Sequence, residues 1–359
     1  MPKLSFAIFR RLPRPRLSLR AMMLAVLVFG GGFGWSVASA RRQTETVAMI
    51  KRLGGFVMYD WAQHDGVWYE NTAEPPYPDW LIDRVGMDFL CNVTCVGILS
   101  PEDRDLPPGT PGWPKDGGAL ARRIGEFRHL EVLDVQGNKE VDDGLLARFS
   151  GLGQIRTLDI GETSVTGAGL IHLAGMAKLE DLTLDGLPIR DADLARLSGL
   201  TSFKTLWLPG EHLTDAGLAH LGSLTNLEEL HIDAKGHPSA ITSKGLAHLA
   251  GLRKLKTLDI IGSKVESLES IRNLTGLGEI RIRDSALEDG GLGVLSGFVE
   301  LGRLDLDGNP KITDAVLAHL AELKQFRELS LSGTGVTTAG IDSLRATLKA
   351  RRPRGWVQF

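Results

Sequence analysis

The sequence predicts an α/β fold of the solenoid type, a right-handed stack of strand-plus-helix units. The first observation is repetition: residues 213–232 read LTDAGLAHLGSLTNLEELHI, and residues 312–331 read ITDAVLAHLAELKQFRELSL in the same register. The second is that the pattern L-x-x-L-x-L recurs along most of the chain at nearly constant spacing. Such periodicity is typical of proteins in which each unit stacks on its neighbours. We therefore expect one elongated array rather than separate compact lobes.

The strand of each unit is predicted by the last two apolar positions of the pattern. These positions alternate with polar residues, which indicates a strand with one buried face. The middle apolar residues of the copies are Leu133, Leu158, Leu182, Leu206, Leu230, Leu258, Ile280, Leu304 and Leu329, with a degenerate earlier copy at Val96. The parallel strands of successive units are expected to form one continuous sheet.

A second apolar set follows each strand. In one unit it consists of Leu218, Leu221 and Leu224, whose spacing of three fits a short helix or 3₁₀ segment with one buried stripe. Thr214 and Asp215 precede this set and are suited to accept the unpaired amide protons of its first turn. A single unit cannot bury its own apolar face, and stacking buries it between neighbours.

These units resemble the leucine-rich repeat family, in particular the class whose units continue as V/I-T-D-x-G-L. The matching segments are VTGAGL (165–170), LTDAGL (213–218) and ITDAVL (312–317), with VDDGLL (141–146) as a looser match. The resemblance covers about residues 89–345. It implies a horseshoe with a parallel sheet on the concave side and short helices on the convex side.

Residues 21–40 read AMMLAVLVFGGGFGWSVASA, without a charge. About 20 apolar residues span a bilayer, so we expect an uncleaved transmembrane anchor. The basic residues in 1–20 predict a cytoplasmic N-terminus and a repeat domain outside. The alternative is a signal peptide cleaved near Ala40, which would release a secreted protein. The layout also resembles bacterial membrane-anchored leucine-rich repeat proteins, with S-L-R before the anchor (18–20) and R-L-G-G-x-V-x-Y-D after it (52–60).

Caps and one insertion complete the expected domain organisation. A stack exposes apolar core at both ends, so residues 41–88 are expected to cap the first coil. Residues 89–344 form the repeats, and residues 345–359 form a C-terminal cap and basic tail. Between the first two coils, residues 99–118 contain five prolines, which indicates an extended surface loop.

Charge and cysteine content argue against two classes of protein, general nucleic-acid-binding proteins and domains held together by disulfides. Residues 1–52 hold ten Lys or Arg and one acid, a net charge of +9, whereas the whole chain carries −3. The remaining body is acidic, which argues against general nucleic-acid binding. Cys91 and Cys95 would lie roughly 13 Å apart on a strand, too far for a disulfide, although a helical turn would bring them closer. We expect two free, buried thiols.

The concave face is the expected place for binding. The residue after each middle apolar position points outward, and strands about 4.7–4.9 Å apart align these residues in one column. The column reads Asp134, Asp159, Thr183, Trp207, His231, Asp259, Arg281, Asp305 and Ser330. A large ring facing solvent is costly unless it is covered or binds something, and Trp is common at binding hot spots. We predict a partner-binding centre at Trp207, beside His231 and the loop that contains His237.

The predicted binding set lies on this concave face. It comprises Trp207, His231, Asp159, Thr183, Asp233, Asp259, Arg281 and Asp305. Two alternatives stay open. The long loop after residue 233 would bury Trp207 if it folded over the ring. The concave acids are either simply solvated or attract a basic partner or a hard cation such as calcium.

No catalytic motif accompanies these features. The sequence contains no phosphate-binding loop, nucleophile elbow or H-E-x-x-H motif, and a solenoid surface lacks the enclosed pocket that enzymes usually use. We expect no catalytic residue, metal or cofactor. The predicted function is a non-enzymatic, membrane-anchored module that binds an unidentified protein or peptide. The alternatives are a secreted or cytosolic leucine-rich repeat adaptor and a metal-dependent module that uses the concave aspartates.

Overall fold

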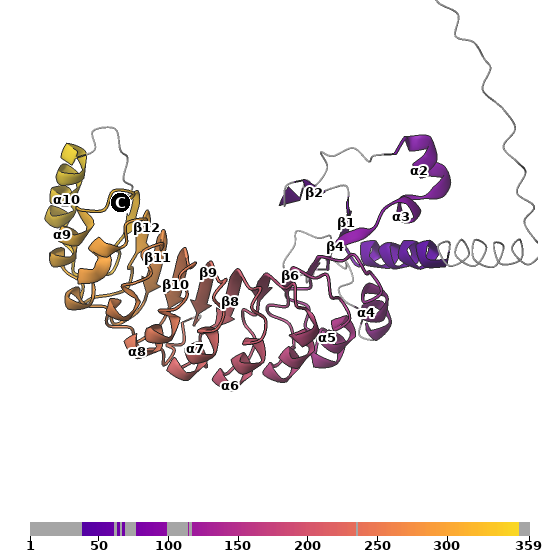
Figure 1. Ribbon diagram of the computed structural model, residues 1–359, viewed down its shortest axis with the longest axis horizontal. Helices are drawn as coiled ribbons and strands as arrows, with labels where there is room; N and C mark the ends of the chain where they lie inside the picture. The colour runs from indigo at the N-terminus through magenta and orange to yellow at the C-terminus, as the bar shows by residue number, and fades with distance from the viewer. Residues whose placement is uncertain are drawn as a thin grey trace, which may run out of the picture.

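The computed structural model describes residues 38–60, 63–64, 67–68, 77–98, 114, 117–234 and 236–351. They form a curved solenoid, with one strand per coil on the concave side and helical segments on the convex side (Figure 1). An eleven-stranded sheet runs in the order β1-β4-β5-β6-β7-β8-β9-β10-β11-β12-β13. The predicted solenoid with a parallel sheet is therefore confirmed.

The parallel part of the sheet contains one strand from each repeat. These strands are β4 (Val93–Gly97), β5 (Val132–Asp134), β6 (Thr157–Asp159), β7 (Asp181–Thr183), β8 (Thr205–Pro209), β9 (Glu229–Asp233), β10 (Thr257–Ile261), β11 (Glu279–Arg283), β12 (Arg303–Asp305) and β13 (Glu328–Ser330). They pair without a register shift, so Leu206 lies beside Leu230, which lies beside Leu258. All three are fully buried. The repeating leucines thus form one continuous core along the array.

The convex side is formed by short helical segments. They are α4 (Gly118–Ile124), α5 (Asp143–Phe149), η3 (Gly167–Gly175), α6 (Asp191–Leu194), η4 (Ala195–Leu197), α7 (Asp215–Leu221), α8 (Ser243–Leu246), η5 (Ala247–Leu249), η6 (Glu269–Ile271), η7 (Asp289–Gly291), η8 (Gly293–Gly297), η9 (Asp314–Val316) and α9 (Leu317–Leu320). Thr214 begins α7 as predicted, and its hydroxyl oxygen accepts the amide proton of Ala216 at 3.1 Å. Leu218 and Leu221 are fully buried, so α7 presents one apolar stripe to the core.

A ladder of hydrogen bonds joins the starts of neighbouring helical segments. The carboxylate of Asp191 accepts two bonds from Thr214 in the next repeat, from the backbone N–H at 2.9 Å and from the hydroxyl at 2.6 Å. The same two bonds recur between Asp143 and Thr166, Asp215 and Thr242, Asp289 and Thr313, and Asp314 and Thr337. Asp215 was expected to act within its own turn, and it instead reaches the neighbouring repeat.

Gly217, two residues after Asp215, leaves room for the aspartate of the preceding repeat, Asp191. A Cβ atom on Gly217 would lie 2.5 Å from Asp191 Oδ1, closer than real Cβ contacts allow. The T-D-x-G spacing therefore has a physical explanation. Thr caps its own helix, Asp bonds to the next repeat, and Gly leaves room for the aspartate of the preceding repeat.

Both ends of the array are covered. On the N-terminal side, a helix over residues 38–52 buries Val47 and Ile50, and β1 (Phe56–Tyr59) pairs antiparallel with β4. The short helices α2 (Asp79–Val85) and α3 (Met87–Leu90) follow, and β2 (Gln63–His64) pairs with β3 (Val67–Trp68) in a separate sheet. On the C-terminal side, α10 (Thr338–Arg351) buries Leu344 and Leu348.

Some predictions fall on residues that the structure does not describe. The expected anchor at 21–40 lies outside the described residues except for 38–40, and most of the 99–118 insertion lies outside them too. In the described ranges no helix combines the length and apolarity needed to cross a bilayer. The two cysteines, Cys91 and Cys95, are free and buried, as predicted.

Candidate binding site on the concave face

Four side chains form a row across β8, β9, β10 and β11. Trp207 is the register partner of His231, which is the partner of Asp259, which in turn is the partner of Arg281. Each of them follows the middle apolar residue of its strand and therefore points away from the core. The structure thus brings together four of the predicted binding residues without any gap in the row.

Trp207 is the apolar centre of this row. Its indole lies parallel to the imidazole of His231, with ring centroids 3.7 Å apart and planes 6° apart. Despite this contact, Trp207 remains 37% exposed. The prediction that the ring points outward is confirmed, and the alternative in which the neighbouring loop buries it is wrong.

His231 and Asp259 lie deeper than the sequence suggests. They are 6% and 5% exposed, although both were expected to contact solvent or a partner directly. Larger side chains contact both residues from the adjacent strands: Trp207 stacks on His231, and Arg281 bonds to Asp259. We therefore correct the expectation, because these two residues lie beside Trp207 in the row and are too buried to present a contact surface.

Polar contacts connect the row. His231 Nδ1 lies 3.5 Å from Asp259 Oδ2, and Arg281 Nη1 lies 3.3 Å from the same oxygen. Arg281 also forms an ion pair with Glu279 on its own strand. His231 Nε2 and Asp259 Oδ1 are buried and have no hydrogen-bond partner among the described residues, with Glu229 Oε2 3.6 Å from the imidazole nitrogen.

The concave aspartates of the same column have a structural role. Asp159 Oδ1 accepts the amide proton of Gly161 at 2.9 Å, and Asp305 Oδ1 accepts that of Asp307 at 3.1 Å. Such a bond to the amide two residues later is the usual way in which Asp closes a turn. The repetition of aspartate at the end of the strand therefore has a local explanation that does not require a ligand.

Burial perturbs these carboxyl groups. Burial raises the pKa of Asp159 to about 6, and the nearby carboxylates of Asp134 and Asp185 raise it further, against hydrogen bonds from Gly161 and Thr183 that lower it. Burial also raises the pKa of Asp305 above its ordinary value. Asp159 thus holds its negative charge near neutral pH at a free-energy cost.

The other predicted residues flank the row. Thr183 is half-buried on β7 as the register partner of Trp207 on one side and of Asp159 on the other. Asp233 is half-buried at the end of β9, in register with Pro209 and Ile261. His237, in the loop after β9, is exposed.

The sequence analysis named Arg281 but missed two further arginines beside it, Arg283 on β11 and Arg303 on β12. Arg281, Arg283 and Arg303 line a recess of about 220 Å³ together with Leu304, Asp305, Glu328 and Ser330. Arg303 Nε donates to Glu328 at 2.7 Å, and Arg283 Nε lies 3.7 Å from Asp305. Arg283 stands two residues after the column position of its strand and Arg303 two residues before that of its strand, so tracing all outward positions would have found them.

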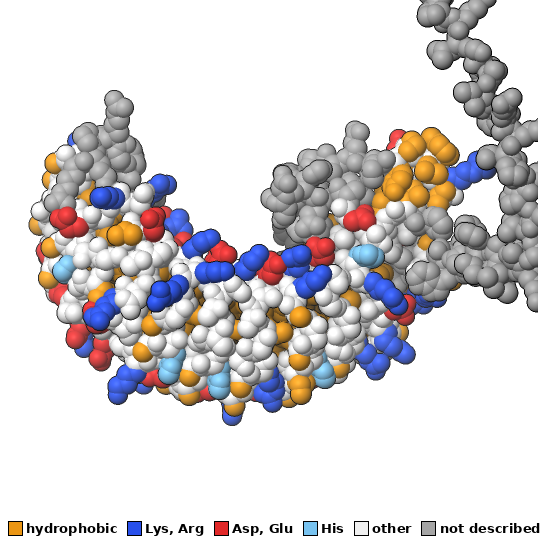
Figure 2. Space-filling view, in the orientation of Figure 1, with side chains coloured by type: hydrophobic (Ala, Val, Ile, Leu, Met, Phe, Trp, Pro, Cys, Tyr) orange, Lys and Arg blue, Asp and Glu red, His pale blue; other side chains and the backbone are white. Residues whose placement is uncertain are grey.

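The two halves of the concave face differ in charge. The outward positions of β5 to β9 include several acids and no Lys or Arg, whereas β11 and β12 contribute three arginines. Along the edge of this face, acidic and basic side chains alternate (Figure 2). Glu180, directly before β7, pairs with Arg156 and with Lys204, and the hydrogen bond from Lys204 lowers the pKa of that carboxyl group. Exposed pairs of this kind contribute little to stability.

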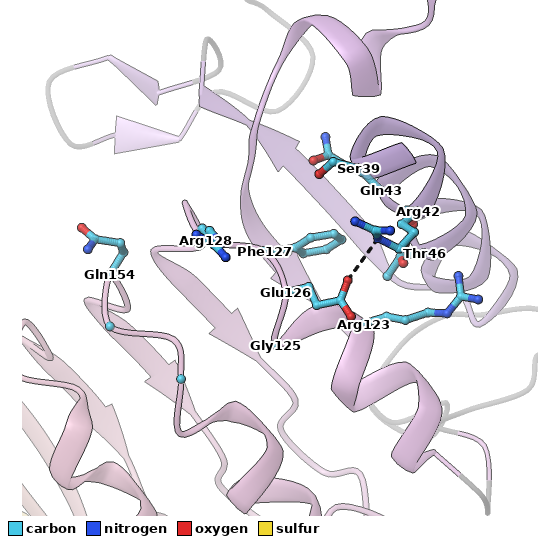
Figure 3. A pocket seen from close by; sticks show the side chains of 12 residues that line it. Ser39, Arg42, Gln43, Thr46, Arg123, Gly125, Glu126, Phe127, Arg128 and Gln154 are labelled. Atoms are coloured by element: carbon cyan, nitrogen blue, oxygen red, sulfur yellow. Dashed lines mark hydrogen bonds and ion pairs between the residues drawn. The ribbon is translucent and has the colours of Figure 1, made fainter. Parts of the chain in front are cut away.

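A second recess lies at the junction of the N-terminal helix and the first repeat. It has a volume of about 710 Å³ and is open and mostly polar. Figure 3 shows Arg42 directed at Glu126 across it, with 3.5 Å between the charged atoms. Arg123 and Glu45 form a second ion pair at 2.8 Å. These two ion pairs attach the N-terminal helix to the first repeat, which accounts for the charged side chains that line the recess.

The structure offers no site for the metal-dependent alternative within its described ranges. These contain no group of three or more His, Cys, Asp or Glu side chains placed to hold a metal ion. The concave aspartates are spread along the sheet; Asp159 and Asp305 bond to backbone amides, and Asp259 contacts His231 and Arg281.

The repeat geometry agrees with the similarity to known proteins. Each L-x-x-L-x-L unit contributes one parallel strand in unbroken register and one convex helical segment. Over 100 residues the chain is 32% identical to leucine-rich repeat-containing protein 42 of Mus musculus, an alignment that covers 24% of each protein. Over 86 residues it is 33% identical to the Bos taurus protein of the same name, covering 21% of this chain and 20% of that protein. The chain is a leucine-rich repeat protein.

This leucine-rich repeat protein spans about a quarter, or less, of the length of the curated relatives it matches. No family model matches the chain. Among solved structures, an internalin from Listeria monocytogenes has a TM-score of 0.42 and 17% identity, covering 71% of this chain and 84% of that one. A TDR receptor has a TM-score of 0.46 and 16% identity, covering 62% of this chain and 43% of that one. Repeat solenoids generally use their extended concave surface for binding.

Proposed function

We propose that this leucine-rich repeat protein binds a protein or peptide through its concave face, with Trp207 as the central anchor, and that it is not an enzyme. The observation that carries the proposal is the indole of Trp207, 37% exposed in a column of polar side chains. A partner that covers the ring removes its apolar surface from water. Tryptophan is also among the residue types most enriched at binding hot spots.

The surroundings of Trp207 support this role. The stack on His231 restricts the indole before any partner arrives, and Asp259 and Arg281 restrict His231 in turn. A side chain that is ordered in advance loses less conformational entropy on association. His231 and Asp259 therefore act as positioning residues, and Trp207 is the contact.

We further propose that residues 21–40 anchor the chain in a membrane, with the N-terminus in the cytoplasm and the repeats outside. The uncharged run of residues 21–40 and the basic residues before it support this arrangement. A secreted form, cleaved near Ala40, is the second candidate, and the A-S-A sequence at 38–40 favours it. Both candidates leave the concave face free to bind.

Site-specific photocrosslinking in the native cell tests the binding proposal. A photoreactive amino acid replaces Thr205, which lies on β8 two residues before Trp207, or replaces Ile171 on the convex η3, which is 60% exposed. We expect a discrete adduct from the concave position that is lost when Trp207→Ala is added, and no such adduct from the convex position. Identical adducts from both positions would rule out a concave binding site.

A further inference from the structure

We propose that the partner inserts an arginine side chain into a slot on the concave face, with Trp207 as one wall, Asp159 as the other and Thr183 as the floor. This inference rests on the proposed function, because it names the chemistry by which a partner reaches Trp207. The three residues stand on the consecutive strands β8, β6 and β7 and follow the middle apolar residue of each strand.

The register of the strands defines the slot. Thr183 on β7 is the partner of Asp159 on one side and of Trp207 on the other. Because neighbouring strands are about 4.8 Å apart, the Trp207 and Asp159 backbones are separated by roughly 9–10 Å. Thr183 is the smallest of the three side chains and is half-buried, and its hydroxyl bonds to the Asp159 carboxylate, which directs that carboxylate toward β7.

The orientation of the indole makes one of its faces available. One face of Trp207 is occupied by His231, in a parallel stack between register partners. A ring that stacks on the neighbour across one strand gap presents its opposite face to the other strand gap. That opposite face is directed toward β7 and the slot, and the ring as a whole is 37% exposed.

The charge of the slot selects a cation. No outward position of β5 to β9 is Lys or Arg, while Asp134, Asp159, Asp181 and Asp185 lie on or beside β5 to β7. Asp159 is half-buried, and its raised pKa of about 6 reflects both this burial and the neighbouring Asp134 and Asp185. A cation placed between the carboxylate and the indole offsets the unfavourable burial of that charge and gains a cation–π contact.

The other face of the indole, away from the slot, lies against a buried imidazole. His231 Nε2 is buried and has no hydrogen-bond partner among the described residues, although buried polar atoms are nearly always paired. The imidazole lies directly against Trp207. His231 therefore fixes the indole from the β9 side and leaves the face toward β7 for the partner.

Arginine fits this slot better than lysine. Its planar guanidinium stacks flat on an indole and presents several N–H donors in a fork that matches a carboxylate, whereas an ammonium is a compact, strongly hydrated charge. An anionic group is disfavoured here, because the arginines that would attract it lie on β11 and β12. Arg281 and Arg303 there are already paired with acidic side chains.

Titration of the full chain with short peptides tests the assignment. The probes are acetyl-Gly-Arg-Gly-amide and its lysine and citrulline counterparts, and the readout is the NMR resonance of the Trp207 indole N–H, identified by its loss in Trp207→Phe. We expect the arginine peptide to shift this resonance, the lysine peptide to bind more weakly, and the uncharged citrulline peptide to cause no shift. An equal response to citrulline or lysine, or no response to arginine, overturns the proposal.

Two matched variants complete the test. Asp159→Asn keeps the shape of the wall and removes its charge, so affinity for the arginine peptide is expected to fall about tenfold or more, which corresponds to one partly buried ion pair. Asp342→Asn removes the same charge on α10, remote from the slot, and is expected to leave the titration unchanged. Unchanged binding in Asp159→Asn overturns the proposal.

Capture of the crosslinked partner by two variants distinguishes failure of the arginine slot from failure of the concave binding site. Capture that survives Trp207→Ala contradicts the concave binding site as a whole. Capture that is lost with Trp207→Ala and persists with Asp159→Asn contradicts the arginine slot alone.

Discussion

Trp207 and His231 occupy equivalent positions on neighbouring strands, and their rings stack with centroids 3.7 Å apart and planes 6° apart. The two residues nevertheless differ in exposure, at 37% for the indole and 6% for the imidazole. The two residues therefore have different roles: His231 restricts the orientation of the indole, and Trp207 presents it to solvent. This division makes the stability of the fold and the binding of a partner separable by mutation.

The first prediction compares two adjacent residues of β8. Trp207→Ala should lower the free energy of unfolding by less than about 1 kcal/mol, because the ring is on the surface. Leu206→Ala should lower it by about 2–5 kcal/mol, because it leaves a cavity in the repeat core. Urea unfolding followed by circular dichroism measures both. A loss for Trp207→Ala as large as that for Leu206→Ala would mean that the ring is a core residue.

The second prediction concerns the fit between Asp191 and Gly217. Gly217→Ala alone should destabilise the protein, because the new Cβ would lie 2.5 Å from Asp191 Oδ1. In an Asp191→Ala background that obstruction is absent. The new Cβ would then lie 3.4 Å from Leu194 Cδ1, which is an ordinary contact distance. There Gly217→Ala should be neutral or stabilising by up to about 1 kcal/mol, since Ala favours a helix over Gly.

A double-mutant cycle of unfolding free energies measures this coupling. Asp191→Ala alone should cost about 1–2 kcal/mol, because the amide and hydroxyl of Thr214 lose their acceptor. Equal effects of Gly217→Ala in both backgrounds would show that the aspartate and the glycine do not interact.

The third prediction is a pH dependence at Asp159. Its pKa in the folded protein is raised to about 6 from an ordinary value of 3.8. Between these values the folded state holds a proton that the unfolded state has lost, so this group favours folding less and less as the pH rises toward 6. Above about pH 6 the full penalty is present, and the difference between the two pKa values corresponds to about 3 kcal/mol at most.

Asp159→Asn removes this penalty and still accepts the amide proton of Gly161. Relative to the native chain, the variant should gain about 1–3 kcal/mol of unfolding free energy at pH 8 and little or nothing at pH 4. Urea titrations at both pH values give the comparison. If the variant is less stable than the native chain at pH 8, the Asp159 carboxylate is not destabilised by burial, and the prediction is contradicted.

The fourth prediction concerns the N-terminus of the mature protein. If residues 21–40 form an uncleaved anchor, the protein sediments with membranes and its sequence begins at Met1 or Pro2. Protease added to cells stripped of their outer envelope should then digest the repeats. A mature N-terminus near residue 41 in the soluble fraction would instead support the secreted form.

Much of the fold follows from local rules that the sequence displays openly. The spacing of Leu206, Leu230 and Leu258 predicts the sheet, because each coil contacts only its neighbours and a regular period implies a regular stack. The outward position of Trp207 follows from strand alternation alone. The capping role of Thr214 likewise depends only on residues within its own turn.

Features that depend on neighbours in space were harder to predict. The burial of His231 and Asp259 involves contacts with side chains more than twenty residues away along the chain. The bond from Thr214 to Asp191 depends on how closely two repeats stack, which a single repeat sequence does not specify. Arg283 was missed for a different reason, because only one of the outward columns was followed.

Binding by purified protein tests the central claim most directly. Once photocrosslinking has identified the partner, its affinity is measured by calorimetry for the native chain, for Trp207→Ala and for Trp80→Ala. Trp80 is the matched control, because it is 67% exposed and lies on α2 in the N-terminal cap. We expect Trp207→Ala to weaken binding about 30-fold, as truncation of a hot-spot residue does, and Trp80→Ala to leave it within about twofold. Equal affinities for the native chain and Trp207→Ala would contradict the concave binding site.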